Sequence, residues 1–155
     1  CCRARLIQAI FPDAYFIAVV RNGYAVSEGI IRNRKFHPRF PENKGLFTSI
    51  EDAAEQWLRA NILMCSLQEH LKKYLIIKYE DLVEDPQFIL RKITGFCELP
   101  RHRFAVDDME SGKNERQISA LSPSQIETVT TIALPMLLHF GYEVLNKELV
   151  LANLA

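Results

Sequence analysis

The sequence predicts an α/β fold in which helices pack on a parallel sheet. Two short apolar runs, "YFIAVV" at 15–20 and "YLIIKY" at 74–79, have the length and the β-branched and aromatic content of strands buried on both faces. Segments with helical periodicity precede, separate and follow these runs, which is typical of parallel strands joined by helical crossovers. With 155 residues, of which 48% are hydrophobic, the chain has the size of a single domain with its own core, over 1–155.

The amino-terminal part of the chain predicts one helix on each side of the first strand. Residues Ala4–Ile10 have helical spacing and stop before a proline, which cannot continue the hydrogen-bond ladder. A second helix is predicted from Tyr24 to about Arg34, and the prolines and glycine of "RKFHPRFPENKGLFTS" mark a long exposed loop after it. Basic and aromatic residues alternate around His37, and we interpret this short run as a solvated connection.

A long helix is predicted between the two strands. Thr48 and Glu51 form a capping-box pattern at its start, and the helix ends near Lys72 and Lys73. Its apolar residues recur at helical spacing, at Trp57, Ala60, Met64, Leu67 and Leu71.

The first helix expected after the second strand begins at Asp85 and Pro86, an acidic cap followed by a proline in the first turn. Its apolar face is formed by Ile89, Ile93 and Phe96.

A final helix is expected from Ser122 and Pro123, where Gln125 completes a second capping box. Gly141 supplies its stop, and Pro135 is expected to kink it.

Only two strands are evident, whereas a doubly wound sheet normally has about four or more. The chain also starts at Cys1 inside a segment that has the character of a helix. We therefore expect that part of the sheet is missing or supplied upstream, and that the chain is an incomplete domain.

Composition and charge exclude several classes of function. Nineteen basic and nineteen acidic residues balance, so no overall field gathers nucleic acid or an anionic membrane. The four cysteines and four histidines show no metal-ligand spacing, and Cys65 and Cys97 are expected to be reduced, buried thiols. No apolar run is long enough to span a membrane and no signal segment opens the chain, so we expect a cytoplasmic protein.

Two residues stand where the predicted strands end. Ligands of open parallel sheets bind beyond the carboxyl ends of the strands, and Arg21 and Tyr79 directly follow the two apolar runs at this end. A guanidinium beside a helix start suits a phosphate, and an arginine paired with a neighbouring carboxylate is the structural alternative. Tyr79 could stack on a nucleobase or cap the core. Glu80 and Asp81 after it could act as acid or base, or cap a short helical turn.

Three ordered segments resemble a known family. They are "FPDAYFIAVVRNGYAV", "LIIKYEDLVEDPQFILRKITGFCELP" and the tail "SGKNERQISALSPSQIETVTTIALPMLLHFGYEV", with a tryptophan-bearing helix between the first two. Together they resemble the carboxy-terminal part of a bacterial-type sulfotransferase that uses 3′-phosphoadenosine 5′-phosphosulfate. The resemblance implies a three-layer parallel sheet, similar to P-loop NTPases, that here lacks its amino-terminal strand and loop.

The resemblance also implies a set of donor-binding residues. Arg21 matches the arginine that binds the 3′-phosphate, and Tyr79 matches the tyrosine that lies near the adenine. Lys113 falls in the basic loop that closes over the same phosphate. The family usually places a phosphate-binding serine where this chain has Gly29, and Ser27 is the nearest hydroxyl.

The implied reaction is sulfuryl transfer from this nucleotide to a hydroxyl or amine of a small-molecule or glycan acceptor. No G-x-x-x-x-G-K-[ST] loop is present, and the family's sulfuryl-holding loop and catalytic base would precede Cys1, so we expect the chain alone to be inactive. Two alternatives are a nucleotide kinase-like P-loop enzyme and a non-catalytic module that binds a nucleotide or a protein partner. The sequence leaves the catalytic residue, the acceptor and the oligomeric state open.

Overall fold

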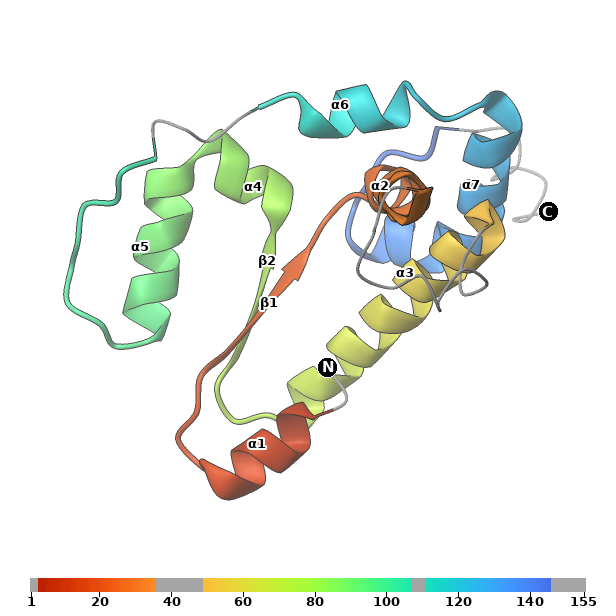
Figure 1. The fold of residues 1–155 in the computed structure, drawn as a ribbon. Helices are drawn as coiled ribbons and strands as arrows, with labels where there is room; N and C mark the ends of the chain where they lie inside the picture. Colours follow the sequence, from red (N-terminus) through yellow and green to blue (C-terminus); the bar gives the residue numbers. More distant parts are fainter. Residues whose placement is uncertain (1–2, 36–48, 107–110, 146–155) are drawn as a thin grey trace. The chain divides into compact units, whose positions relative to one another are not determined.

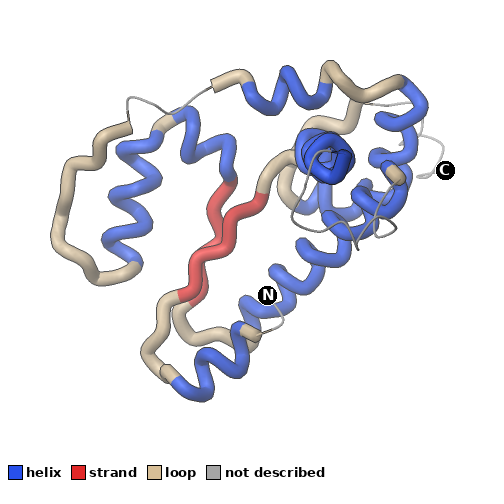
Figure 2. The backbone as a smooth tube through the Cα atoms, viewed as in Figure 1, coloured by secondary structure: helices blue, strands red, loops and turns tan. Residues whose placement is uncertain are grey.

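The computed structural model describes residues 3–35, 49–106 and 111–145. Helices precede, separate and follow the two strands along the chain, as Figures 1 and 2 show. The elements in order are α1 (Ala4–Ile10), β1 (Phe16–Val20), α2 (Gly23–Lys35), α3 (Ile50–Ser66), the 3₁₀ turn η2 (Leu67–Glu69), β2 (Tyr74–Lys78), α4 (Tyr79–Glu84), α5 (Pro86–Phe96), α6 (Lys113–Ile118) and α7 (Pro123–His139). None of the described helices has both the length and the apolar character needed to cross a bilayer.

The two strands form a parallel pair, which confirms the predicted α/β class. Phe16 pairs with Tyr74 and Val20 with Lys78, without a bulge between them. The described residues hold these two strands only, so they form a two-stranded sheet. The crossover between the strands contains α2 and α3, and such a helical connection is what a parallel pair requires.

The prediction that the first strand is covered on both faces is wrong for β1. Val20 is 2% exposed, but Ile17 and Val19 on the other face are 41% and 54% exposed. In the described part of the chain, the face of β1 that carries Ile17 and Val19 is therefore not fully covered. Ile77, the partner of Val19 on β2, is buried.

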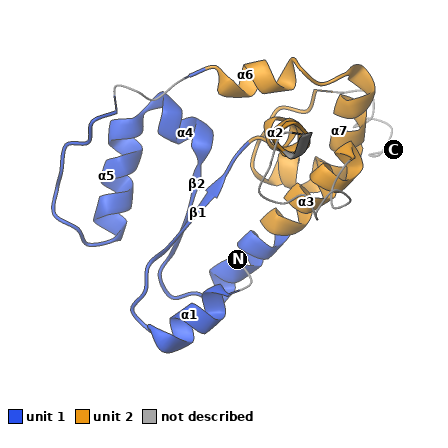
Figure 3. Cartoon of the chain, viewed as in Figure 1, with its two compact units in different colours: residues 1–21, 62–111 blue, residues 22–61, 112–155 orange. Residues whose placement is uncertain are grey.

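The chain divides into two compact units, coloured separately in Figure 3. The first unit comprises residues 1–21 and 62–111, and the second comprises residues 22–61 and 112–155. The sheet, α1, α4 and α5 belong to the first unit, whereas α2, α6 and α7 belong to the second. The boundary passes through α3 and between Arg21 and Asn22.

In the first unit, the Gln8 side chain connects α1 to the turn before β2. The Gln8 amide donates to the His70 carbonyl at 3.0 Å, and its oxygen accepts from the Lys72 backbone N–H at 2.8 Å. The predicted cap of α5 is confirmed, because the Asp85 carboxylate accepts from the Phe88 N–H at 3.0 Å. These contacts use the side chains of polar residues to satisfy backbone groups that the helix and the turn leave unpaired.

The predicted long helix, α3, differs from the expectation in its end, its cap and one core residue. It ends at Ser66 and is followed by the 3₁₀ turn η2, whereas the prediction placed its end near Lys72 and Lys73. Its start is capped by Ser49, whose Oγ accepts from the Asp52 N–H at 3.2 Å, while Thr48 lies outside the described residues. Ala60 is exposed, and Asn61 occupies the core position instead, with 6% of its surface exposed. Asn61 can be buried because its amide donates to the Trp57 carbonyl of the preceding turn at 2.7 Å.

The second unit is built around Tyr24, which is fully buried on α2. Thr130 Oγ1 donates to the Ile126 carbonyl at 2.8 Å, so the Tyr24 hydroxyl must be the donor in its 2.7 Å bond to Thr130. The Tyr24 oxygen in turn accepts from the Leu145 N–H at 3.3 Å. Gly23 allows this close packing, because a Cβ there would lie 3.2 Å from the Trp57 ring.

Both ends of α7 follow the prediction. Ser122 and Gln125 form the capping box, and Gly141 has a left-handed φ of 65°. The Tyr142 N–H then donates to the Leu137 carbonyl at 2.8 Å, which closes the helix end. Pro135 lies within α7, and the expected kink stays a prediction.

We predict that the Tyr24–Thr130 hydrogen bond couples α2 to α7 energetically. Tyr24→Phe should lower the free energy of unfolding by about 1–2 kcal/mol, because it leaves buried polar groups without their partner. A double-mutant cycle with Thr130→Val should give a coupling of about 1 kcal/mol in urea unfolding. Thr131→Val is the matched control, since the neighbouring Thr131 hydroxyl is exposed and bonds only within its helix, to Glu127. Additive effects of Tyr24→Phe and Thr130→Val would contradict the coupling.

Candidate functional site

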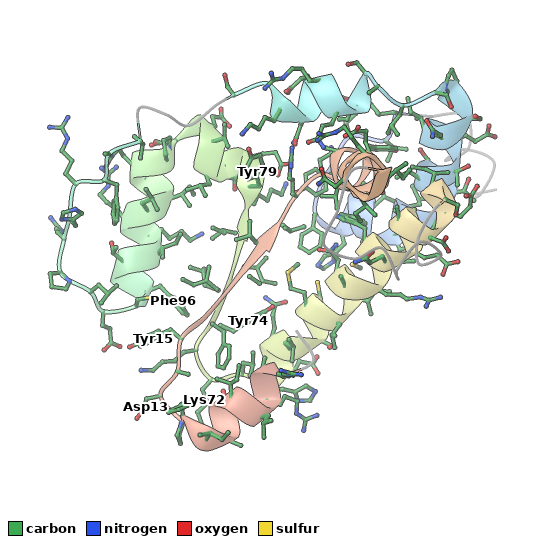
Figure 4. All side chains as sticks on the ribbon, viewed as in Figure 1. Asp13, Tyr15, Lys72, Tyr74, Tyr79 and Phe96 are labelled. Carbon is green, nitrogen blue, oxygen red and sulfur yellow. The ribbon has the colours of Figure 1, made fainter. Side chains whose placement is uncertain are left out.

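The carboxyl ends of β1 and β2 place Arg21 and Tyr79 together in the first unit. Val20 pairs with Lys78, so the next residue of each strand stands at the same edge of the sheet. The Arg21 Cζ lies 4.6 Å from the centroid of the Tyr79 ring, which is a cation–π contact. Figure 4 labels Tyr79 at this end of β2. Both residues therefore stand where the strand prediction requires them.

This arrangement suits an anionic ligand with an aromatic part. A guanidinium binds phosphate through the N–H groups at its edge, and stacking on a ring uses its face. The contact with Tyr79 holds the guanidinium of Arg21 at this edge of the sheet. Tyr79 itself is half-buried.

Polar groups close to this edge have structural roles. Tyr79 opens the short helix α4, and Glu80 and Asp81 lie in its first turn, where their charge complements the helix dipole. The expectation that α2 offers its first N–H groups to a ligand needs correction. The Asn22 side chain accepts from the N–H groups of Tyr24 at 3.0 Å and of Ala25 at 3.3 Å, so this side chain caps the helix.

A second cation–aromatic pair closes the amino end of the same two strands. Lys73 Nζ lies 4.0 Å from the Tyr15 ring centroid and donates to its hydroxyl at 2.9 Å. This hydrogen bond to Tyr15 holds the pKa of Lys73 above its ordinary value. Phe96 contacts the Tyr15 ring edge-on, and Figure 4 labels Tyr15 and Phe96 at this end. The pair provides an internal comparison for Arg21 and Tyr79, because it lies at the end of the sheet opposite to the predicted ligand site.

Ser27, the hydroxyl nearest in sequence to the serine position and a predicted donor-binding residue, is fully buried in the second unit. It follows Gly23 by one helical turn and therefore shares the face of α2 that packs on Trp57. Among the described residues, its Oγ has no hydrogen-bond partner. A contact with a ligand would require this hydroxyl to become accessible, and its role in donor binding stays a prediction.

Gly29, where the serine was expected, has a structural reason to lack a side chain. A Cβ at this position would lie 2.8 Å from Gln117 Nε2. The amide of Gln117 passes over Gly29 and donates to the Ala25 carbonyl at 3.1 Å and to Glu28 Oε2 at 2.8 Å. No local pattern indicates this contact, because Gln117 is far along the chain from Gly29.

Lys113 is not in a loop, as the sequence suggested, but is the first residue of α6. Gly112 before it has a φ of 76°, a left-handed conformation that turns the chain into this short helix. Lys113 is exposed and belongs to the second unit, together with Ser27.

The described residues contain no cluster of three or more histidine, cysteine or acidic side chains that could hold a metal ion. Cys65 and Cys97 are free thiols, as predicted, but they are half-buried and not fully enclosed. Burial raises the pKa of the Cys65 thiol, which makes it a weaker nucleophile at neutral pH.

Comparison with known protein families identifies the family of the chain. The profile of the sulfotransferase family matches residues 2–103. The chain belongs to the sulfotransferase family. The matched part includes Arg21, Ser27 and Tyr79, whereas Lys113 lies beyond it. A search of the curated proteins finds no match to the chain. Membership of this sulfotransferase family indicates sulfuryl transfer in general, and it does not favour the nucleotide kinase-like alternative.

We predict that Ser27→Ala does not destabilise the sulfotransferase domain. The substitution removes a buried hydroxyl that lacks a partner and adds helix propensity, so the free energy of unfolding should rise by about 1 kcal/mol. Thermal unfolding followed by circular dichroism measures this change. A fall in stability of about 1 kcal/mol or more would show that the hydroxyl makes a contact that the structure lacks.

Proposed function

We propose that the protein transfers the sulfuryl group of 3′-phosphoadenosine 5′-phosphosulfate to a hydroxyl or amine of a small-molecule or glycan acceptor. The observation that carries the proposal is the contact of Arg21 with Tyr79 at the carboxyl end of the parallel strands, within the part that matches the family. These two side chains bring a cation and an aromatic ring together, and the donor combines a phosphate with an adenine.

In this proposal each residue has a distinct task. Arg21 binds the 3′-phosphate through charge-assisted hydrogen bonds, which are among the strongest polar contacts in proteins. The Tyr79 ring contacts the adenine, since base–aromatic stacking contributes about 1–3 kcal/mol. Lys113, which belongs to the second unit, is a further donor-binding residue that the resemblance implies, and its role stays a prediction. None of these groups touches the bond that breaks, so they anchor the donor.

The chemical step exchanges one bond to sulfur for another. The acceptor oxygen or nitrogen attacks the sulfur, the bond from sulfur to the bridging phosphate oxygen breaks, and adenosine 3′,5′-bisphosphate leaves. A base takes the proton of the acceptor. Positioning and cationic stabilisation should supply most of the rate enhancement, as in phosphoryl transfer. We assign no described residue as the base.

We also propose that β1 and β2 belong to a larger parallel sheet of the three-layer kind found in P-loop proteins. The exposed apolar face of β1, formed by Ile17 and Val19, supports this proposal. So does the edge of β1 that faces away from β2, which has no partner strand in the described ranges. Unpaired, apolar sheet edges are unusual in proteins that do not aggregate.

Arg21→Met should weaken the binding of adenosine 3′,5′-bisphosphate by about tenfold to a hundredfold, because hydrogen bonds to charged groups contribute roughly 1.5–3 kcal/mol. Isothermal titration calorimetry of the wild-type protein and the Arg21→Met variant measures this change in affinity. Lys73→Met is the matched control, since it also removes a cation from an aromatic ring at one end of the strand pair.

The control separates donor binding from the stability of the sheet. We expect Lys73→Met to change nucleotide affinity by less than about twofold, because Lys73 lies at the end of the sheet where ligands do not bind. Equal affinities for the Arg21→Met variant and the wild type would contradict the assignment of Arg21. A protein that binds the nucleotide but transfers no labelled sulfate to any acceptor would be the non-catalytic module.

A further inference from the structure

A cavity of the first unit, here called the acidic cavity, combines carboxylates with apolar side chains. It has a volume of about 240 Å³ and is lined by residues of α4, of α5 and of the junction between them, namely Asp81, Glu84, Asp85, Phe88 and Ile89. Both helices belong to the first unit, as Figure 3 shows. Ile89 is 6% exposed and belongs to the core, whereas Phe88 is 56% exposed. Because small-molecule sites typically have volumes of about 300–1,000 Å³, the size of this cavity suits a single side chain of a partner.

The three carboxylates of the acidic cavity form no ion pair within the ranges that the structure describes. The Asp85 carboxylate accepts from the Phe88 N–H as the cap of α5, and this uncharged donor does not cancel its charge. Like charges in a small space repel one another, so a cation that enters the cavity is stabilised by all three carboxylates. The exposed ring of Phe88 favours a cation as well, because its face attracts positive charge.

A basic segment, residues 101–103 with the sequence Arg-His-Arg, lies in the same unit. All three of its residues are exposed, and Leu99 shortly before them is 58% exposed. The chain after the segment is held on α5, because the Gln87 side-chain amide donates to the Phe104 carbonyl at 2.7 Å. In the part of the chain that the structure describes, neither arginine of the segment forms an ion pair. One unit therefore carries an anionic and a cationic surface, each beside an exposed apolar side chain, and the two form no ion pair with each other.

We propose that the protein self-associates, with the basic segment of one copy bound in the acidic cavity of a second copy. An arginine side chain matches the cavity in three respects. Its guanidinium forms paired, charge-assisted hydrogen bonds with carboxylates, its apolar stem can pack on Phe88, and its cation can lie over the ring. The chain already uses the last of these contacts, where Arg21 lies over Tyr79.

The second copy is the occupant that the charges of the chain itself favour. Every copy contributes one cavity and one segment, so a dimer with two-fold symmetry makes the same contact twice. The paired exposed side chains, Phe88 beside the carboxylates and Leu99 beside the arginines, supply apolar surface at each contact. The contact uses neither Arg21 nor Tyr79, and it does not depend on the proposed function.

The first test measures the self-association of the full chain by analytical ultracentrifugation over a range of protein concentrations. We expect dimers at low ionic strength, and a dissociation constant about tenfold higher in about 0.5 M sodium chloride, because salt screens exposed charges. A chain that is monomeric at every concentration would overturn the proposal. So would a dimer whose dissociation constant does not change with salt.

The second test exchanges the charges of the two surfaces. The cavity variant carries Asp81→Lys and Glu84→Lys, and the segment variant carries Arg101→Glu and Arg103→Glu. Each variant alone should dimerise at least about tenfold more weakly than the wild type, because like charges then oppose each other.

An equal mixture of the cavity variant and the segment variant should form dimers again. In the mixed dimer, one contact joins two unchanged surfaces and the other joins two surfaces whose charges are both reversed. The control variant, with Glu51→Lys and Glu69→Lys, reverses two exposed carboxylates outside the cavity and should change the dissociation constant by less than about twofold. A mixture that stays as monomeric as its components would overturn the proposal.

The third test separates the second copy from other basic partners. Phe88→Ala should weaken dimerisation by about tenfold, since exposed aromatic side chains often dominate the energy of an interface. A monomeric chain that binds an oligoarginine peptide, and loses this binding in the cavity variant, would assign the cavity to another basic protein and overturn self-association. Nucleotide binding that depends on Arg21 in a monomeric chain would overturn self-association and leave the proposed function intact.

Discussion

The parallel register of β1 on β2 is the constraint on which the first unit depends. Because Val20 stands opposite Lys78, the residues just beyond the strands meet at one edge and those just before them meet at the other. Each edge then receives one cation and one aromatic ring, Arg21 with Tyr79 and Lys73 with Tyr15. A slip of one residue would reverse the faces of every side chain and separate both pairs. The register of the strand pair therefore places a guanidinium beside an aromatic ring at the carboxyl end of the sheet.

In the second unit, glycines on α2 decide which elements can approach it. Gly23 admits the Trp57 ring on one face, and Gly29 admits the Gln117 amide on another. The first contact surrounds Tyr24, whose hydroxyl is satisfied by partners far away in sequence. The second contact brings a helix with two cationic side chains to the surface of α2. Position 29 therefore has a structural role. The glycine there, in place of the serine that the resemblance implies, leaves the room that the Gln117 side chain occupies.

Local patterns in the sequence predict most of the elements but not their contacts. The strands, the caps at Asp85 and Ser122 and the positions of Arg21 and Tyr79 follow from short-range signals. The helix α6 was missed because six residues give too little periodicity, and its start depends on the left-handed Gly112. Asn61 was not predicted in the core because its side chain is polar. Its burial depends on the hydrogen bond to the Trp57 carbonyl, which the apolar pattern of the sequence does not show. The burial of Ser27 and the hydrogen bond from Gln117 to the Ala25 carbonyl depend on tertiary packing, which no local pattern predicts.

We propose that the carboxyl end of the β1–β2 pair is the nucleotide site of this sulfotransferase-family protein. Photolabelling with 2-azidoadenosine 3′,5′-bisphosphate, followed by peptide mapping, tests this location directly. We expect the label to appear on the peptide that contains Tyr79 and to disappear when excess unlabelled nucleotide is added. Label confined to the peptides that contain Tyr15 or Lys73, at the opposite end of the same strands, would contradict it.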